Sequence, residues 1–106
     1  MKKLPDLSKF DEISDNDDDF KNVMIGIFKK EFPLEKQAFL DAFEEKNYES
    51  SAEAVHKLKH KINLLNLEAD YRVAALFEEQ LRDNSHELHD AFIGTLEKIE
   101  KFIKKI

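Results

Sequence analysis

Hydrophobic residues recur along most of the chain at intervals of three and four positions, the spacing of one face of an α-helix. Four such stretches, separated by short polar segments, occupy residues of about 17–46, 51–65, 68–83 and 85–105. Each stretch has a single apolar stripe, which a lone helix leaves in water and a bundle buries. The pattern therefore predicts an all-α protein, folded as an antiparallel four-helix bundle in a single domain.

Two features modify the first part of this pattern. Within about residues 1–15, Phe10 and Ile13 predict a short lead-in helix that packs against one end of the bundle. Pro33 lies inside the first long apolar stretch, where proline removes an amide hydrogen and crowds the preceding turn. We therefore expect the helix over 17–46 to be kinked or broken near Pro33.

Polar residues mark the expected helix boundaries. Ser50 followed by Glu53 matches a capping box, which predicts a helix beginning at about residue 51. Asn84 and Glu87 form a similar pair before the last helix. Asn66 is a natural stop for the helix over 51–65, because asparagine tolerates the left-handed conformation that ends many helices.

Composition narrows the classes of function. The formal net charge of −6 argues against a nucleic-acid-binding surface and against general attraction to anionic lipid. The chain has no cysteine, which excludes a disulfide framework and a thiolate nucleophile. No apolar run approaches the roughly 18 residues of a membrane span. These observations favour a cytoplasmic protein with no membrane partner, and monomer is the expected state.

One histidine stands out in the second predicted bundle helix. At about 100° per residue, Val55, Leu58, Ile62 and Leu65 share a sector about 80° wide, which is the expected core stripe. His56 lies about 140° from the centre of that sector and therefore faces water. The residues that we expect to border it on the outer face are Ala52, Lys59, His60 and Asn63, while Lys57 and Lys61 flank the core on the other side.

The surroundings of His56 suit a phosphoryl group. Lysines at 57, 59 and 61, together with His60, form a local basic cluster on an acidic protein, and the small Ala52 one turn earlier leaves the ring uncovered. Neutral imidazole carries a lone pair and attacks a phosphoryl group without a separate base. A neighbouring ammonium offsets the negative charge of the product.

The stretch AVHKLKHKINLLNLEA resembles the signature of histidine-containing phosphotransfer (Hpt) domains, the carriers of multistep phosphorelays. Their pattern is His-x-Leu-Lys-Gly, followed after several residues by a short Leu-Gly-type helix stop. His56, Leu58 and Lys59 match that pattern, and Asn66 stands at the stop glycine. The likeness extends to the order of helices over about residues 10–106, and it implies a four-helix bundle.

The resemblance also implies a function. His56 is then the phosphoacceptor, through Nε2, and Lys59 is the supporting cation. The phosphoryl group comes from an aspartyl phosphate on a response-regulator receiver domain, or from a hybrid sensor histidine kinase, and passes to another receiver. The partner brings the Mg²⁺ and most catalytic groups, so this chain is a carrier, not an enzyme, and binds no cofactor. The residues expected to line the docking face are Ala52, Lys57, His60 and Asn63.

One position departs from the family pattern. Hpt domains usually carry glycine or another small residue four positions after the histidine, which lets a partner backbone come close. This chain has His60 there. The imidazole ring either obstructs docking or itself contacts the phosphoryl group or the partner.

Other readings compete with phosphotransfer. His56 and His60 have a spacing that can hold zinc, as do His86 and His89, but a zinc site usually has three or four ligands. The sequence shows no glycine-rich phosphate loop or hydrolase motif, and the pairs Glu44–Glu45 and Glu78–Glu79 are expected to be solvated. The serious alternative is an adaptor bundle that binds a partner protein without being phosphorylated.

Overall fold

The structure is a computed structural model that describes residues 4–106. Residues 1–3, the start of the predicted lead-in, lie outside the described residues. Within 4–106 every regular element is an α-helix, which confirms the prediction of an all-α protein. The helices are α1 (Ser8–Ser14), α2 (Asp18–Glu44), α3 (Tyr48–Leu64), α4 (Glu68–Arg82) and α5 (His89–Ile103).

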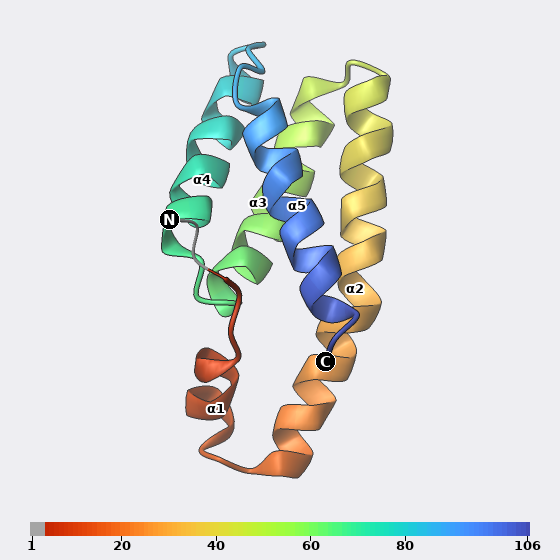
Figure 1. The fold of residues 1–106 in the computed structure, drawn as a ribbon. Helices are drawn as coiled ribbons and strands as arrows, with labels where there is room; N and C mark the ends of the chain where they lie inside the picture. The colour runs from red at the N-terminus through yellow and green to blue at the C-terminus, as the bar shows by residue number, and fades with distance from the viewer. Residues whose placement is uncertain (1–3) are drawn as a thin grey trace.

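The long helices α2, α3, α4 and α5 lie side by side, and each runs opposite to the one before it (Figure 1). α3 contacts α2 on one side and α4 on the other, α5 contacts α4, and α1 packs against α2. α3 is therefore covered along two of its flanks, and this arrangement decides which of its residues reach water.

α2 is one helix from Asp18 to Glu44 and passes through Pro33. The alternative of two helices meeting at Pro33 is therefore wrong. The Pro33 side chain is exposed, while Phe28, Phe32 and Phe39 are buried on both sides of it. Because most helix stability in a protein comes from burying an apolar face, this packing sustains the helix despite the missing amide hydrogen.

α3 begins earlier than the sequence predicts. Its N-cap is Asn47, whose side-chain oxygen accepts a hydrogen bond from the Ser50 backbone amide at 3.1 Å. The predicted capping box at Ser50 is therefore wrong, and residues 48–50 form the first turn of the helix. The reason lies in the preceding turn, where Lys46 adopts a left-handed conformation (φ 58°) and ends α2 early enough for Asn47 to cap.

α5 begins later than expected, at His89, and its start has no side-chain cap. The predicted pairing of Asn84 with Glu87 is therefore wrong. Asn84 instead adopts φ 60° after α4, and the Leu88 amide donates to the side-chain oxygen of Gln80 at 3.2 Å. A side chain from α4 thus takes the place of the local cap.

The end of α3 agrees with the prediction. Asn66 has φ 63°, the left-handed conformation expected of it. The flanking residues Leu65 and Leu67 are both buried. The chain can therefore reverse sharply into α4 while both leucines remain in the core.

Aromatic rings fill the centre of the bundle. Phe39 of α2 lies 5.1 Å from Phe92 of α5 and 5.9 Å from Phe77 of α4, measured between ring centroids. All three side chains are fully buried. Phe20 and Ile27 of α2 have the helical spacing of Phe28, but both are about half exposed. The N-terminal part of α2 extends past the ends of the other long helices and lies beside the short α1 (Figure 1), which leaves one side of it exposed.

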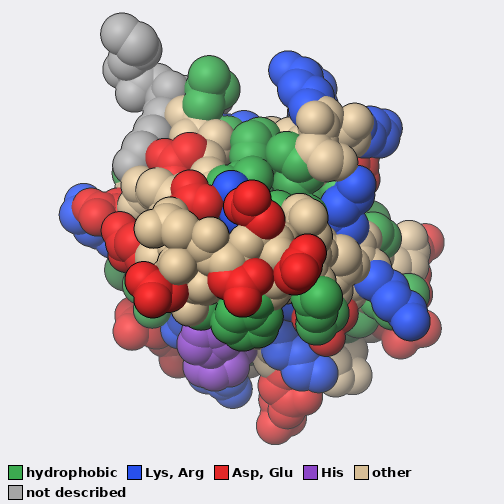
Figure 2. All heavy atoms as spheres, turned by 90° about the horizontal axis from the view of Figure 1, so that it is seen from below, with side chains coloured by type: hydrophobic (Ala, Val, Ile, Leu, Met, Phe, Trp, Pro, Cys, Tyr) green, Lys and Arg blue, Asp and Glu red, His purple; other side chains and the backbone are tan. Residues whose placement is uncertain are grey.

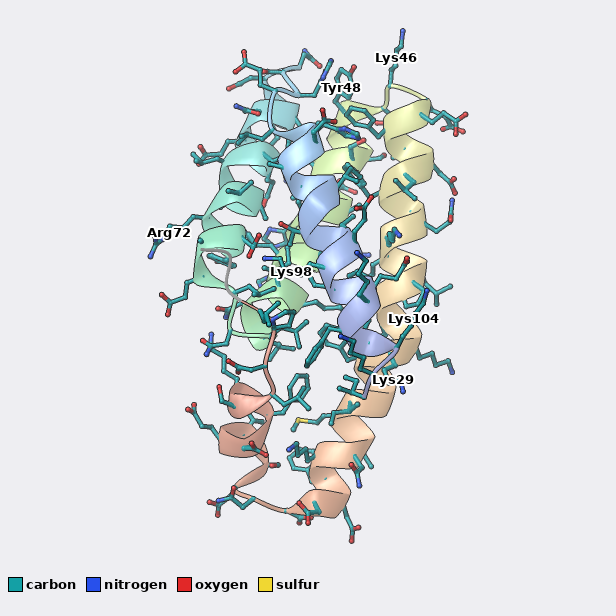
Figure 3. All side chains as sticks on the ribbon, in the orientation of Figure 1. Lys29, Lys46, Tyr48, Arg72, Lys98 and Lys104 are labelled. Atoms are coloured by element: carbon teal, nitrogen blue, oxygen red, sulfur yellow. The ribbon has the colours of Figure 1, made fainter. Side chains whose placement is uncertain are left out.

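Polar contacts hold α5 to its neighbours. Lys98 of α5 pairs with Asp70 of α4 at 2.8 Å, and Thr95 donates to the same carboxylate at 2.7 Å. Lys29 of α2 donates to the backbone carbonyl of Ile106 at 2.6 Å, near the C-terminus (Figure 3). These contacts anchor α5 on the opposite side of the bundle from the outer face of α3.

Candidate functional site

His56 lies on the outer face of α3, as the helical spacing predicts. Its side chain is 52% exposed, whereas Val55, Leu58 and Ile62 on the inner face are fully buried. Histidine side chains lie at the surface of the molecule beside basic side chains in the view from below (Figure 2). The buried residues fix the helix, so the imidazole ring projects from a rigid element.

The ring of His56 rests against a carboxylate from the neighbouring helix. Nδ1 of His56 lies 3.3 Å from Oε1 of Glu78 on α4, and also 3.3 Å from Oε2. An ionised carboxylate only accepts hydrogen bonds, so this contact requires the hydrogen on Nδ1. In the neutral ring the lone pair is then on Nε2.

Glu78 is shared by two cations as well as by His56. Nζ of Lys59 donates to Oε1 at 3.0 Å, and Nη2 of Arg82 donates to Oε2 at 3.2 Å. The Glu78 side chain is only 12% exposed. Because a partly buried carboxylate is stable when charged donors surround it, these contacts hold Glu78 in one position under the ring of His56.

The ionisation of Glu78 follows from these contacts. Burial by itself would raise the pKa of the Glu78 carboxyl group. The hydrogen bonds from Lys59 and Arg82, the positive charge of Lys59 and the contact with His56 act the other way and leave the pKa below its ordinary value. Glu78 is therefore an anion at neutral pH and is available to orient the imidazole.

The basic cluster predicted around His56 is largely paired. Lys59 is engaged by Glu78, and Lys61 pairs with Glu31 and Glu35 of α2 at 3.0 and 3.1 Å. Both lysines lie on flanks of α3 where a neighbouring helix supplies carboxylates. The positive field inferred from the sequence is consequently smaller than the lysine content of α3 indicates.

Ala52 does not border the water-exposed face of α3. Its side chain is fully buried, so the expectation that it lies on the outer face and lines a docking surface is wrong. That expectation assumed that only the sector about 80° wide that contains Val55, Leu58 and Ile62 is buried. Because both α2 and α4 cover α3, the buried sector widens and includes Ala52, only about 40° around the helix from His56.

The other predicted docking residues reach the surface. His60 is exposed, and its ring is perpendicular to that of His56, with 4.9 Å between the centroids. Asn63 is exposed, and its side-chain oxygen accepts a hydrogen bond from Lys9 of α1 at 2.9 Å. Lys57 is exposed on the other side of His60 and lines a shallow groove between α3 and α2. These three side chains and His56 define the outer face of α3.

Sequence reasoning missed Glu78, which it assigned to a solvated face together with Glu79. Glu79 is exposed, as expected, but Glu78 faces α3. One signal was available, because Glu78 and Arg82 have the i,i+4 spacing of a helical ion pair. The contacts of Glu78 with His56 and Lys59 required knowledge of which face of α4 meets α3.

The two histidine pairs lie in different surroundings. His89 stacks on Phe43 at 4.2 Å between ring centroids, and His86 meets the edge of the same ring at 5.6 Å. Among residues 4–106, no group of three or more potential ligands is arranged to hold a metal ion. The rings of His56 and His60 contact each other, but within residues 4–106 no third side chain is positioned to complete a metal site with them.

No protein-family model matches this chain, and neither does any curated protein or solved structure. Within the described part of the chain, no helix combines the length and apolar character needed to cross a lipid bilayer.

Proposed function

We propose that this chain is a phosphorelay intermediate that carries a phosphoryl group on His56. The observation that carries the proposal is the exposed imidazole of His56 with its Nδ1 held against Glu78, which leaves Nε2 as the nucleophilic nitrogen. The match of His56, Leu58 and Lys59 to the Hpt pattern supports it. On this view α2 to α5 form the antiparallel four-helix bundle of that family, with α1 as its lead-in.

The proposed step is an in-line phosphoryl transfer. The Nε2 lone pair of His56 forms a bond to phosphorus while the bond between phosphorus and the aspartyl oxygen of the receiver breaks, and its electron pair stays on the receiver carboxylate. The ring keeps its Nδ1 hydrogen and becomes a phosphoimidazolium. The positive charge that develops on the ring faces the carboxylate of Glu78, so the reaction needs no separate base. The reverse step passes the phosphoryl group to another receiver.

Lys59 is the proposed supporting cation. Its ammonium and the Nδ1 of His56 contact the same oxygen of Glu78, so the cation lies close to the acceptor ring before any phosphoryl group arrives. A phosphoryl group on His56 brings nearly two negative charges at pH 7 and competes with Glu78 for this ammonium. Lys59 then stabilises the phosphorylated state by dividing its contacts between the two anions.

The proposed partners are response-regulator receiver domains or the receiver of a hybrid sensor histidine kinase. The Mg²⁺ and most catalytic groups are expected on the receiver. This chain supplies the nucleophile and a docking face that includes Lys57, His60 and Asn63. We propose a cytoplasmic location, because phosphorelay receivers act there. The proposed oligomeric state is a monomer.

An adaptor function is the second candidate. One observation favours it, since α1 and α2 expose large hydrophobic side chains, an arrangement that often marks a protein-binding surface. These side chains are Ile13, Phe20, Val23, Ile27 and Leu34. An adaptor would bind its partner through such a surface and leave His56 unmodified.

The test is phosphoryl transfer from a panel of phosphorylated receiver domains. We expect an acid-labile, alkali-stable label on the wild type, mapped to His56 under alkaline conditions. The His56→Gln variant should fold and remain unlabelled, while His86→Gln, altered at a distant histidine, should label normally. No labelling by any receiver would favour the adaptor. Persistent labelling of His56→Gln would place the acceptor elsewhere, with His60 as the nearest candidate.

A further inference from the structure

His60 is in direct contact with the acceptor ring. It follows His56 by one helical turn on α3, and the two rings are perpendicular, with their centroids 4.9 Å apart. Both side chains are exposed. A phosphoryl group bonded to a nitrogen of His56 would therefore lie within electrostatic reach of the His60 ring and of any proton that it binds.

The charged groups on this part of α3 and on the elements that contact it come from four helices. α4 contributes Glu78 and Arg82, which pair with each other below His56. α2 contributes Glu31 and Glu35, both of which are engaged by Lys61. The remaining groups are Lys9 of α1, which donates to Asn63, and Glu53, Lys57 and Lys59 on α3 itself.

These pairings distinguish His60 from the lysines. Lys59 and Lys61 are engaged by carboxylates, and a lysine ammonium keeps its charge throughout the range near neutral pH. Imidazole as a group gains or loses its charge near pH 6.5, and when protonated it offers two N–H donors. Histidine is therefore the residue type in this cluster that can exchange a proton near neutral pH.

We propose that His60 is a proton-dependent ligand of the phosphoryl group on His56, so that protonation of His60 favours retention of that group on this chain. The inference rests on the phosphorelay function proposed above. An imidazolium beside the negatively charged oxygens of a phosphoryl group is stabilised even in a water-like dielectric. The chain should therefore hold its phosphoryl group more strongly as the pH falls from about 8 to about 6.

Thermodynamic reciprocity makes the idea measurable without a partner protein. If a proton on His60 stabilises the phosphoryl group, then the phosphoryl group must stabilise that proton by the same amount. Phosphorylation of His56 should therefore raise the pH at which His60 titrates. The expected displacement is on the order of half a pH unit or more, given the separation and the exposure of both rings.

The experiment is an NMR titration of the four histidine rings before and after phosphorylation with phosphoramidate. This small-molecule donor phosphorylates imidazole directly and needs no receiver. We expect the titration midpoint of His60 to move upward in the phosphorylated protein while that of His86, at the other end of the bundle, stays in place. An unchanged midpoint for His60 would overturn the inference.

A second readout uses a phosphorylated receiver and the His60→Gln variant. The equilibrium ratio of phosphorylated chain to phosphorylated receiver is compared between wild type and variant, so that the pH dependence of the receiver cancels. The wild type should exceed the variant by about three- to tenfold at pH 6, and the two should converge above pH 8. Equal ratios at every pH would contradict the proposal.

The outcomes separate the two proposals. If phosphoramidate labels His56 and the His60 midpoint moves, but no receiver transfers a phosphoryl group, the phosphorelay is wrong and the coupling of the two rings stands. If receivers label His56 but the midpoint is unchanged, the phosphorelay stands and the role of His60 is wrong. Failure of every donor to label His56 would overturn both.

Discussion

The carboxylate of Glu78 on α4 lies 3.3 Å from Nδ1 of His56 on α3, and one of its oxygens also accepts a hydrogen bond from Lys59. The contact joins residues 22 positions apart in the chain. It decides which nitrogen of the exposed ring carries the hydrogen, and it provides an anion that faces the charge expected to develop during phosphoryl transfer.

Replacement of Glu78 by glutamine should slow phosphoryl transfer to His56. The amide is uncharged, so it orients Nδ1–H less strongly and no longer offsets the charge on the phosphorylated ring. A charge-assisted hydrogen bond contributes about 1.5–3 kcal/mol, and partial solvent exposure reduces this, so we expect a loss on the order of tenfold. Transfer rates from a phosphorylated receiver measure the effect.

The matched control is Glu79→Gln, which changes the neighbouring exposed carboxylate of α4. This variant removes the same charge from the protein without touching His56. Equal rates for the two variants would show that Glu78 has no positioning role.

The Glu78→Gln substitution should also change how the stability of the protein depends on acidic pH. The pKa of Glu78 is lowered in the folded state, so its contribution to stability is present above the unfolded pKa of about 4.3 and is lost as the pH falls through the folded value. Wild type should exceed Glu78→Gln in free energy of unfolding at pH 7, and the difference should shrink at about pH 3. Urea unfolding at both pH values measures it.

Glu100 does not disturb this comparison. Its pKa is also lowered, by the hydrogen bond and the charge of Lys36, but the pair is intact in both proteins and cancels in the difference. A difference that stays constant between pH 7 and pH 3 would contradict the assigned ionisation of Glu78.

Replacement of Lys59 by alanine should weaken the phosphorylated state. It removes the ammonium that is proposed to share its contacts between Glu78 and the phosphoryl group. Partly exposed ion pairs contribute up to about 1 kcal/mol, so we expect the half-life of phosphohistidine, or the transfer rate, to fall about two- to fivefold. Lys101→Ala removes an exposed lysine of α5, outside the proposed docking face, and serves as the control. Identical behaviour of the two variants would remove the role of Lys59.

The turn after α3 can be tested by stability alone. Asn66 has φ 63°, a conformation that costs alanine about 1 kcal/mol and glycine almost nothing. Both Asn66→Ala and Asn66→Gly lose the contacts of the side-chain amide with Asp6 and Ser8, so their difference isolates the backbone. We expect the alanine variant to have the lower free energy of unfolding. A less stable glycine variant would contradict the strain argument.

Local information in the sequence accounted for the helices and for the exposure of His56. Helical periodicity predicted that Val55, Leu58 and Ile62 are buried and that His56 is not, because both follow from the turn of one helix. The left-handed stop at Asn66 is likewise a property of one residue type and its own backbone. These inferences needed no knowledge of neighbouring helices.

Inferences that depended on neighbours were less successful. Ala52 is buried because two helices flank α3, and the expected capping box at Ser50 gave way to Asn47 because α2 ends in a left-handed turn. Pro33 is accommodated because phenylalanines on both sides of it are held in the core. At Pro33 tertiary packing outweighed a local penalty of about 3 kcal/mol for proline inside a helix.

The sequence by itself determined that this chain folds into amphipathic helices and that one of them presents a histidine to solvent. Only the tertiary structure decided that Glu78 lies under the ring and that Lys59 and Lys61 are paired with carboxylates. The physical reason is that helical spacing relates residues within about one turn, whereas ion pairing depends on the rotation and depth at which two helices pack.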